Sequence, residues 1–123
     1  MSPCAAAITV GATGCPASAA AAADRCAADE VSDFSNHGAA VDVYAPGDKV
    51  RSAWRASDDA WRVSSGTSMA APLVAGAVAL YLERHPAATP EDIARAIAST
   101  ATALRDRRGT GDKMLNLAVG AGP

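Results

Sequence analysis

The chain has 123 residues, which suits one domain and is too short for two. Its 11 basic and 13 acidic residues give a formal net charge of −2, which offers no electrostatic case for nucleic acid or an anionic membrane as a partner. No apolar run approaches the roughly 20 residues that cross a bilayer, and the first residues lack the pattern of a secretory signal.

The first predicted element is a short apolar strand. Residues 5–10 combine alanine with β-branched residues and are followed by Gly11, a pattern typical of a buried strand in a parallel sheet. Residues 12–30 are rich in small side chains and predict a loop. Residues 34–38 predict a turn.

A second strand and a hairpin follow. Residues 41–44 predict a short strand that ends at the Ala-Pro-Gly run of residues 45–47. Residues 50–54 and 61–63 flank a polar tip and predict a β-hairpin. The single tryptophan in each arm is interpreted as a packing residue of this hairpin rather than as a ligand platform.

A long apolar helix is predicted from Thr67 or Ser68. Pro72 falls in its first turns, where a missing N–H costs little. Apolar residues occupy nearly every face as far as Leu82, so we expect a helix that is buried on all sides. Pro86 marks its end.

A second helix and a last extended segment complete the pattern. Residues 89–92, Thr-Pro-Glu-Asp, form a strong helix start with an N-cap threonine and acids in the first turn. Residues 114–117 predict a short strand or extended segment. Strands that alternate with helices favour the α/β class. The predicted apolar stripe of the second helix consists of Ile93, Ala94, Ile97 and Ala98.

The three cysteines do not predict a zinc site. Cys4, Cys15 and Cys26 lack paired C-x-x-C spacing, and only His37 is near them in sequence. Cys15 and Cys26 can close a loop as a disulfide in an oxidising compartment, which leaves Cys4 over. Three free thiols fit the sequence equally well.

The most informative stretch is residues 65–72, Ser-Gly-Thr-Ser-Met-Ala-Ala-Pro. It places Ser68 between a glycine turn and a helix, whose first N–H groups are unpaired and point outward. A nucleophilic hydroxyl needs a fixed position, donors for an oxyanion and a base. The run resembles the nucleophile motif of subtilisin-like serine peptidases, Gly-Thr-Ser-Met-Ala-x-Pro.

Other segments support the same resemblance, which extends from Ile8 to Leu117. Residues 8–12 resemble a family strand that ends in V-G-A, residues 34–38 resemble F-S-N-x-G, and residues 41–47 resemble V-D-x-x-A-P-G. The whole chain, residues 1–123, is similar to the C-terminal portion of the catalytic domain in the proteinase K-like branch. The resemblance implies part of a three-layer α/β fold, with parallel strands and a buried helix that bears the nucleophile. Residues 14–28 are interpreted as an insertion.

The resemblance implies roles for five neighbouring residues. Ser68 is expected to be the nucleophile, with its N–H as an oxyanion donor, and Thr67 to support the oxyanion. Ser65 and Gly66 are expected to bind substrate, and Met69 to pack beside the site. The expected reaction is endopeptidase cleavage of a polypeptide substrate through an acyl-enzyme.

The resemblance also implies a structural calcium site, although no cofactor is needed for the chemistry. Asp42 matches a calcium ligand of the proteinase K-like branch, with backbone carbonyls at Ala5 and Ala7. Calcium accepts six to eight oxygen ligands, so waters would supply the rest. A surface carboxylate at a strand end is an equally good interpretation of Asp42.

The rest of the expected machinery does not occur in these residues. In the family, the catalytic aspartate, histidine and oxyanion asparagine precede the strand that matches residues 8–12. His37 falls in a predicted turn, and His85 lies a full helix length beyond Ser68. Neither histidine is therefore expected to be the base. We therefore expect the chain alone to be inactive and its partner to be the upstream part of the domain. The resemblance also implies secretion. The alternative to an endopeptidase is a decayed peptidase or a peptide-binding scaffold without catalysis.

Overall fold

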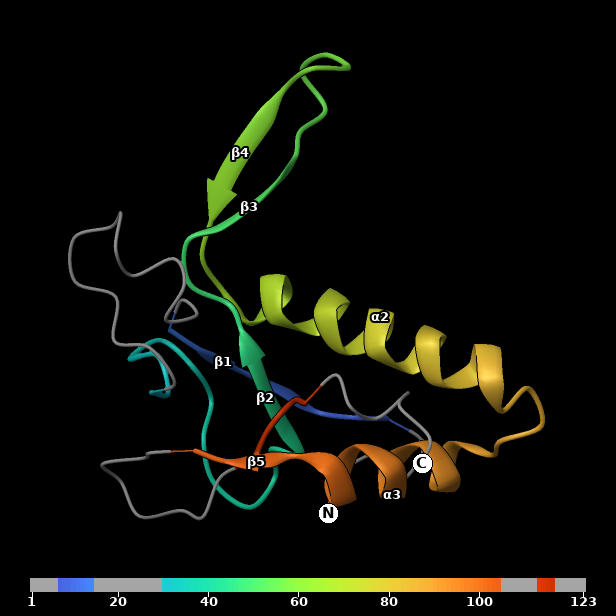
Figure 1. The fold of residues 1–123 in the computed structure, drawn as a ribbon. Coiled ribbons are helices and arrows are strands. Elements are labelled where there is room, and N and C mark those ends of the chain that lie inside the picture. The colour runs from blue at the N-terminus through green and yellow to red at the C-terminus, as the bar shows by residue number, and fades with distance from the viewer. Residues whose placement is uncertain (1–6, 15–29, 105–112, 117–123) are drawn as a thin grey trace.

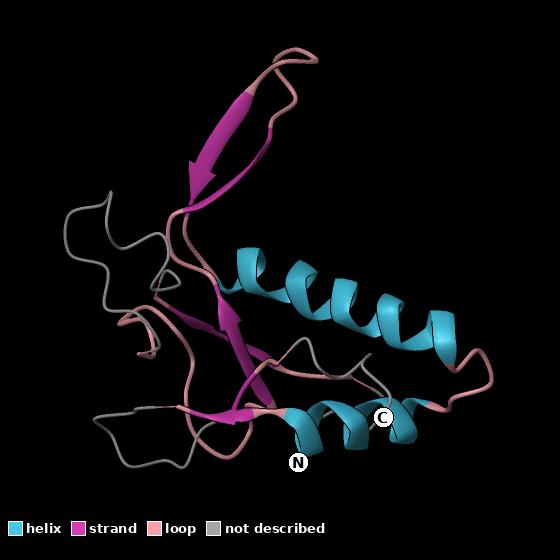
Figure 2. Cartoon of the chain, viewed as in Figure 1, coloured by secondary structure: helices cyan, strands magenta, loops and turns pink. Residues whose placement is uncertain are grey.

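The structure, a computed structural model, describes residues 7–14, 30–104 and 113–116 (Figures 1 and 2). It confirms the α/β class: four strands come first in the described residues, followed by two helices and then two short strands. The three cysteines lie outside the described residues. So does the predicted insertion at residues 14–28, except for residue 14. The elements are β1 (Val10–Thr13), β2 (Val43–Pro46), β3 (Val50–Ala53), β4 (Trp61–Ser64), α2 (Thr67–Arg84), α3 (Pro90–Thr100), β5 (Thr102–Ala103) and β6 (Lys113–Met114).

The main sheet has the order β1-β2-β6-β5. β1, β2 and β6 run parallel, as predicted, and β5 pairs antiparallel with β6. The sequence did not reveal β5, because two residues directly after a helix carry no strand pattern of their own. β6 is also shorter and earlier than the predicted segment 114–117.

β1 and β2 both begin and end later than predicted, and they end later because the apparent stop residues take part in pairing. β1 continues through Gly11, where a Cβ would lie 2.4 Å from Cε1 of Tyr44, so the missing side chain leaves room for the tyrosine ring. β2 includes Pro46, which pairs with Thr13 at the end of the ladder. The Gly47 N–H donates to the Thr13 carbonyl of β1. Because successive backbone groups of a strand point in opposite directions, the nitrogen of Pro46 points away from β1, so its missing N–H costs no bond to that strand.

The outer edge of β1 is partly covered by residues 30–35, which include the start of the predicted turn at residues 34–38. The Ala12 N–H donates to the buried Ser35 hydroxyl oxygen at 2.8 Å, and the Ala12 carbonyl accepts from the Ser32 N–H at 3.0 Å. The Gly14 N–H donates to the Glu30 carbonyl at 2.9 Å. The serine of the F-S-N run therefore has a structural role, which is to satisfy the backbone of β1.

The predicted hairpin is confirmed and projects from the rest of the structure (Figure 1). Trp54 and Trp61 are 39% and 60% exposed. They pack within the hairpin as predicted, but against arginines rather than against apolar side chains. The Arg62 guanidinium lies 4.4 Å from the centre of the Trp54 ring, and that of Arg51 lies 4.8 Å from the Trp61 ring. Such cation–π contacts stabilise an arm that has no core beneath it.

The long helix begins at Thr67 and ends before Pro86, as predicted, but it is not buried on all sides. Only Ala70, Val74 and Ala77 are buried, whereas Leu73 and Leu80 are 42% and 52% exposed. In the described part of the chain, one side of α2 packs against β1 and β2 and joins the core that includes α3. No described residue covers the opposite side, so within the described residues the prediction of a helix buried on all sides is wrong.

The second helix has the predicted N-terminus. The Thr89 hydroxyl oxygen accepts from the Asp92 N–H, and the Asp92 carboxylate accepts from the Thr89 N–H, which makes a complete capping box. Ile93 and Ile97 are buried, as predicted. The two alanines of the predicted stripe are exposed instead, because the buried face of this 11-residue helix is only as wide as its isoleucine row.

Gly47 is the point at which β1, β2 and α2 meet. A Cβ on Gly47 would lie 2.6 Å from Cβ of Ala12, 2.8 Å from the Gly66 carbonyl oxygen and 3.2 Å from Cβ of Ala70. The Gly47 N–H donates to the Thr13 carbonyl and the Gly47 carbonyl accepts from the Gly66 N–H. Any side chain here would push the first turn of α2 away from the sheet.

We predict that Gly47→Ala destabilises the chain by about 1–3 kcal/mol, because the added methyl group meets backbone and short side chains that cannot move aside. Urea unfolding followed by circular dichroism measures the effect. The matched control is Gly76→Ala, since a Cβ on Gly76 has nothing within 4 Å and alanine favours a helix by about 0.5–1 kcal/mol. Equal midpoints for the two variants would contradict the proposed close packing at Gly47.

A second prediction concerns the capping box. Hydrogen bonds from the Thr89 backbone N–H and then from its hydroxyl lower the pKa of Asp92 below its ordinary value of 3.8. Because the folded-state pKa is the lower one, this stabilisation is complete above the unfolded-state pKa and is lost as pH falls through the folded-state pKa.

Thr89→Ala should lower the free energy of unfolding by about 0.5–2 kcal/mol near neutral pH. Asp92→Asn should remove the part of the acid dependence that Asp92 causes, as measured by urea midpoints from about pH 6 down to about pH 3. An unchanged acid dependence in Asp92→Asn would show that this carboxyl has no such role.

Candidate active site

The turn before α2 depends on Gly66, the N-cap residue of the helix. Its φ of 153° and ψ of 162° lie in a region that residues with a side chain rarely adopt. Its N–H donates to the Gly47 carbonyl at 2.8 Å, and its carbonyl accepts from the Met69 N–H at 3.0 Å. The chain can therefore leave β4, turn sharply against Gly47 and enter the helix at Thr67.

Ser68 is the second residue of α2 and is exposed. No described residue hydrogen-bonds its hydroxyl. The N-cap glycine supplies no side-chain cap, and the first turn contains no acidic residue. The N–H groups at this end of the helix carry a partial positive charge that a negatively charged oxygen can use. The geometry therefore offers an accessible hydroxyl beside unoccupied anion donors.

The structure brings the five sequence-predicted residues of this segment together around the turn. Thr67 is half-buried as the first helical residue, and the Met69 sulfur lies 3.5 Å from the position that a Cβ on Gly66 would take. The side chain of Ser65 faces the loop before β3: its hydroxyl donates to Asp48 Oδ1 at 2.6 Å and accepts from the Lys49 N–H at 2.9 Å.

Gly47, Asp48 and Lys49 were not predicted to take part in the site. The only sequence signal near them is the Ala-Pro run that they follow. That run predicts the end of a strand and does not indicate a functional site. Their proximity to Ser65 and Gly66 depends on the β3–β4 hairpin, which returns the chain to its starting point.

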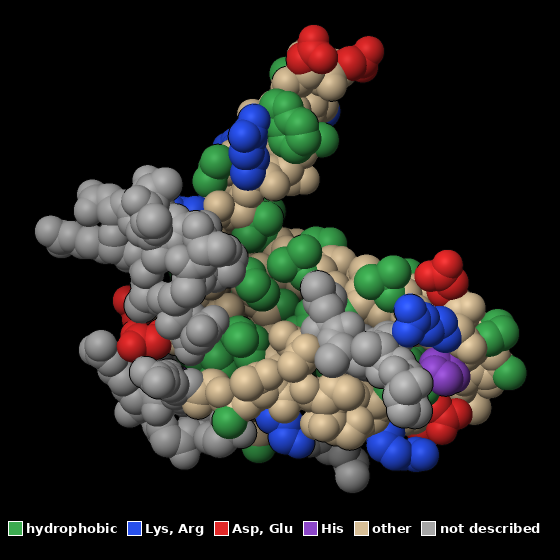
Figure 3. Space-filling view, in the orientation of Figure 1, with side chains coloured by type: hydrophobic (Ala, Val, Ile, Leu, Met, Phe, Trp, Pro, Cys, Tyr) green, Lys and Arg blue, Asp and Glu red, His purple; other side chains and the backbone are tan. Residues whose placement is uncertain are grey.

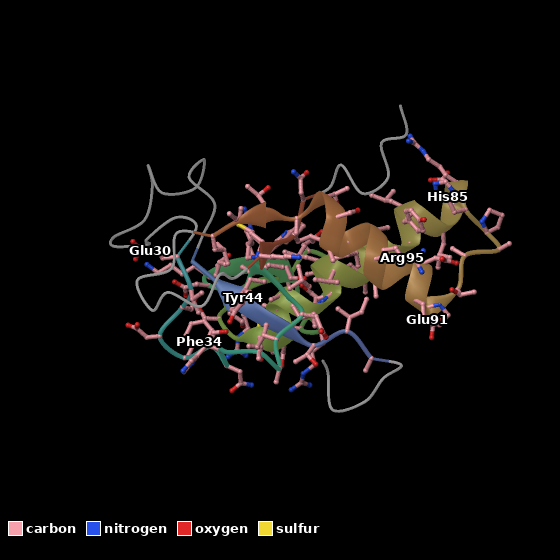
Figure 4. The ribbon with its side chains drawn as sticks, turned by 90° about the horizontal axis from the view of Figure 1, so that it is seen from below. Glu30, Phe34, Tyr44, His85, Glu91 and Arg95 are labelled. Carbon is pink, nitrogen blue, oxygen red and sulfur yellow. The ribbon has the colours of Figure 1, made fainter. Side chains whose placement is uncertain are left out.

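In the described part of the chain, neither histidine hydrogen-bonds the Ser68 hydroxyl. His85 caps the other end of α2, and a rise of about 1.5 Å per residue puts it about 25 Å along the helix from Ser68. Its ring packs against Tyr81, with 4.5 Å between ring centres. Figure 4 shows His85 at the opposite end of the molecule from Phe34, the first residue of the turn that contains His37. The site thus contains an exposed hydroxyl beside helix N–H groups, but no described residue that hydrogen-bonds this hydroxyl.

Asp42 is fixed next to the start of β1. Its Oδ2 accepts from the Thr9 N–H at 2.7 Å, and its own N–H donates to the Thr9 carbonyl at 3.0 Å. Ala7 lies two residues before Thr9, and Ala5 lies outside the described residues. Carboxylate and carbonyl oxygens suit calcium in kind. Within the described ranges, however, no three His, Cys, Asp or Glu side chains gather in a way that could hold a metal ion.

No helix in the described part of the chain is long and apolar enough to cross a membrane.

The sequence is similar to extracellular and alkaline serine proteases. The extracellular serine proteinase of Thermus sp. (strain Rt41A) is 45% identical over 97 residues, which cover 79% of this chain and 21% of the relative. The alkaline serine exoprotease A of Vibrio alginolyticus is 44% identical over 89 residues, or 71% of this chain and 16% of the relative. The chain therefore spans about a fifth of the length of these relatives.

The fold is similar to solved proteases as well. A cold-adapted subtilisin-like serine proteinase is 39% identical with a TM-score of 0.72, over 89% of this chain and 36% of that structure. A protease of Pseudoalteromonas arctica PAMC 21717 is 28% identical with a TM-score of 0.77, over 95% of this chain and 35% of that structure. A sequence model of the subtilase family matches residues 2–122. The chain belongs to the subtilase family and corresponds to one part of its subtilisin-like domain.

Proposed function

We propose that the chain is the nucleophile-bearing part of a serine endopeptidase, with Ser68 as the catalytic residue. The observation that carries the proposal is the exposed Ser68 hydroxyl at an uncapped helix N-terminus, directly after the Gly66 turn. The relatives named as serine proteinases support the reaction class.

In the proposed reaction, Ser68 Oγ attacks the carbonyl carbon of a peptide bond and passes its proton to a histidine on the upstream part of the domain. The carbonyl oxygen becomes an oxyanion that the Ser68 N–H stabilises, with support from the Thr67 hydroxyl. Collapse of the tetrahedral intermediate expels the amine with that proton, and water then hydrolyses the acyl-enzyme. Ser65 and Gly66 would hold the substrate, and the Ser65 contact would use the backbone because its hydroxyl is engaged by Asp48.

The chain needs a partner for this reaction, and we infer that the partner is the upstream part of the domain with the catalytic Asp, His and Asn. A hydroxyl without a base is a weak nucleophile, and loss of the histidine or the serine from a subtilisin triad costs about 10⁶-fold in kcat. The isolated chain should therefore have no measurable protease activity.

Two exposed apolar features support such a partner. One side of α2 is open to solvent, and hydrophobic side chains appear along it in Figure 3. A groove of about 420 Å³ lies between the residues that lead into β1 and the helices α2 and α3. Apolar surface of this kind is expected where another part of a domain packs. The exposed residues on α2 include Ala71, Pro72, Leu73, Ala75, Gly76 and Leu80.

We also propose that the protein acts outside the cell, since the Thermus relative is named as an extracellular enzyme.

The test adds an upstream part of the domain to the chain. Residues 1–123 are joined behind the upstream segment of the Thermus relative, and cleavage of a chromogenic peptide is measured. We expect activity in this chimera, none in the isolated chain, and loss of about 10⁶-fold in kcat in the chimera with Ser68→Ala. Labelling by a fluorophosphonate should follow the same pattern.

The control is the chimera with Ser57→Ala, an exposed serine at the hairpin tip, which should keep full activity. A folded chimera that binds peptides without cleaving them would instead support a non-catalytic scaffold. If the chimera with Ser68→Ala remained active, Ser68 could not be the nucleophile.

A calcium site at Asp42 is a further expectation of the proposal. If calcium binds there, added Ca²⁺ should raise the thermal midpoint of the chimera, and Asp42→Asn should remove most of that increase. Asp33→Asn, at an exposed carboxylate in the turn before Phe34, is the matched control. Equal responses to Ca²⁺ in both variants would rule out Asp42 as the ligand.

A further inference from the structure

A side-chain contact joins the two ends of the β3–β4 hairpin next to the candidate nucleophile. The Ser65 hydroxyl donates to Asp48 Oδ1 at 2.6 Å, and the same oxygen accepts from the Lys49 N–H at 2.9 Å. We call these three residues the Asp48–Ser65 clamp. The hydrogen bond to the carboxylate is charge-assisted and short, which makes it one of the stronger kinds in proteins.

The clamp continues the hairpin towards α2. The β3–β4 ladder ends at the pair Val50–Ser64. Beyond that pair, the Ser65 side chain takes the Lys49 N–H, and the Gly66 N–H then donates to the Gly47 carbonyl at 2.8 Å. Hydrogen bonding thus continues from the hairpin to Gly66, the N-cap of the helix, which lies two residues before Ser68.

The backbone at Lys49 shows that this connection is under constraint. Lys49 has a φ of 53°, in the left-handed region that a lysine rarely adopts. Such a conformation persists only where its surroundings hold it. The acceptor for the Lys49 N–H is Ser65 Oγ, and that oxygen is itself held by Asp48.

Among the described residues, no side chain caps this end of the helix. Its N-cap is a glycine without a side-chain hydrogen bond, and the first turn has no acidic residue. A side-chain cap would compete for the N–H groups that an oxyanion needs. The clamp can hold the turn from outside the helix and leave those N–H groups unoccupied.

We propose that Asp48 and Ser65 are positioning residues that set the place of Ser68 through Gly66. The assignment rests on the proposed function, since it concerns the geometry of the same nucleophile. Loss of the clamp frees Lys49 from its left-handed conformation and allows the Gly66 turn to shift. Displacements of about 1 Å at a reacting group can cost about 100-fold in rate without a change in substrate contacts.

The test uses the chimera described above, with kcat and KM measured separately. Ser65→Ala and Asp48→Ala should each lower kcat by about 10- to 100-fold and leave KM within about twofold. Ser65→Thr keeps the hydroxyl, and the exposure of Ser65 leaves room for the methyl group, so this variant should restore most of kcat. The matched control is Ser52→Ala, an exposed serine of β3 outside the clamp, which should behave as wild type.

A second measurement is independent of turnover. Hydrogen exchange at the Gly66 amide, which donates to Gly47, should become about 10-fold faster in Ser65→Ala than in Ser52→Ala, while the urea midpoints of the two variants stay close.

The outcomes separate the two proposals. An active chimera in which Ser65→Ala keeps wild-type kcat, changes only KM, or is not rescued by Ser65→Thr overturns the positioning role. Unchanged exchange at Gly66 overturns it as well. An inactive wild-type chimera that is folded overturns the proposed function itself, and the positioning of a catalytic serine with it.

Discussion

The close approach at Gly47 is the constraint on which the rest of the site depends. A position without a side chain lets the end of β2, the end of β1 and the first turn of α2 come within van der Waals distance of one another. Its two backbone hydrogen bonds then tie the sheet at Thr13 to the turn at Gly66. The location of Ser68 follows from this junction, because α2 begins one residue after Gly66.

The hairpin and the helix are coupled through the same junction. β3 leaves it and β4 returns to it, so the arm with its stacked arginines and tryptophans is closed at its base by Asp48 and Ser65. An extended arm with little core beneath it needs such a closure, since two strands alone are marginal in water. The same hydrogen bonds that close the arm also lie next to the Gly66 turn that precedes Ser68.

The exposed side of α2 and the adjoining groove fit our proposal that another part of the domain completes the active site. The proposed nucleophile Ser68 is exposed at the N-terminus of α2, and no described residue hydrogen-bonds its hydroxyl. The apolar surface on α2 lies on the same helix that bears Ser68. Packing on that surface would place another part of the domain beside the site, so assembly of the core and assembly of the active site are one event in our proposal.

The sequence by itself determined the α/β class, the hairpin, both helix starts and the nucleophile motif. Each of these depends on local chemistry: the strand and turn pattern around residues 50–63, the capping box at Thr89, and the Gly66 turn before an apolar helix. Strand ends were predicted less well, because pairing carries β1 through Gly11 and β2 to Pro46.

Only the tertiary structure decided which apolar faces are buried and what surrounds Ser68. An alanine-rich helix has no strong apolar stripe, so its sequence could not indicate that Ala70, Val74 and Ala77 are the residues of α2 that become fully buried. The contact of Ser65 with Asp48 joins residues 17 positions apart. Its existence depends on the return of the hairpin to Gly47, a long-range constraint that no local pattern of residues contains.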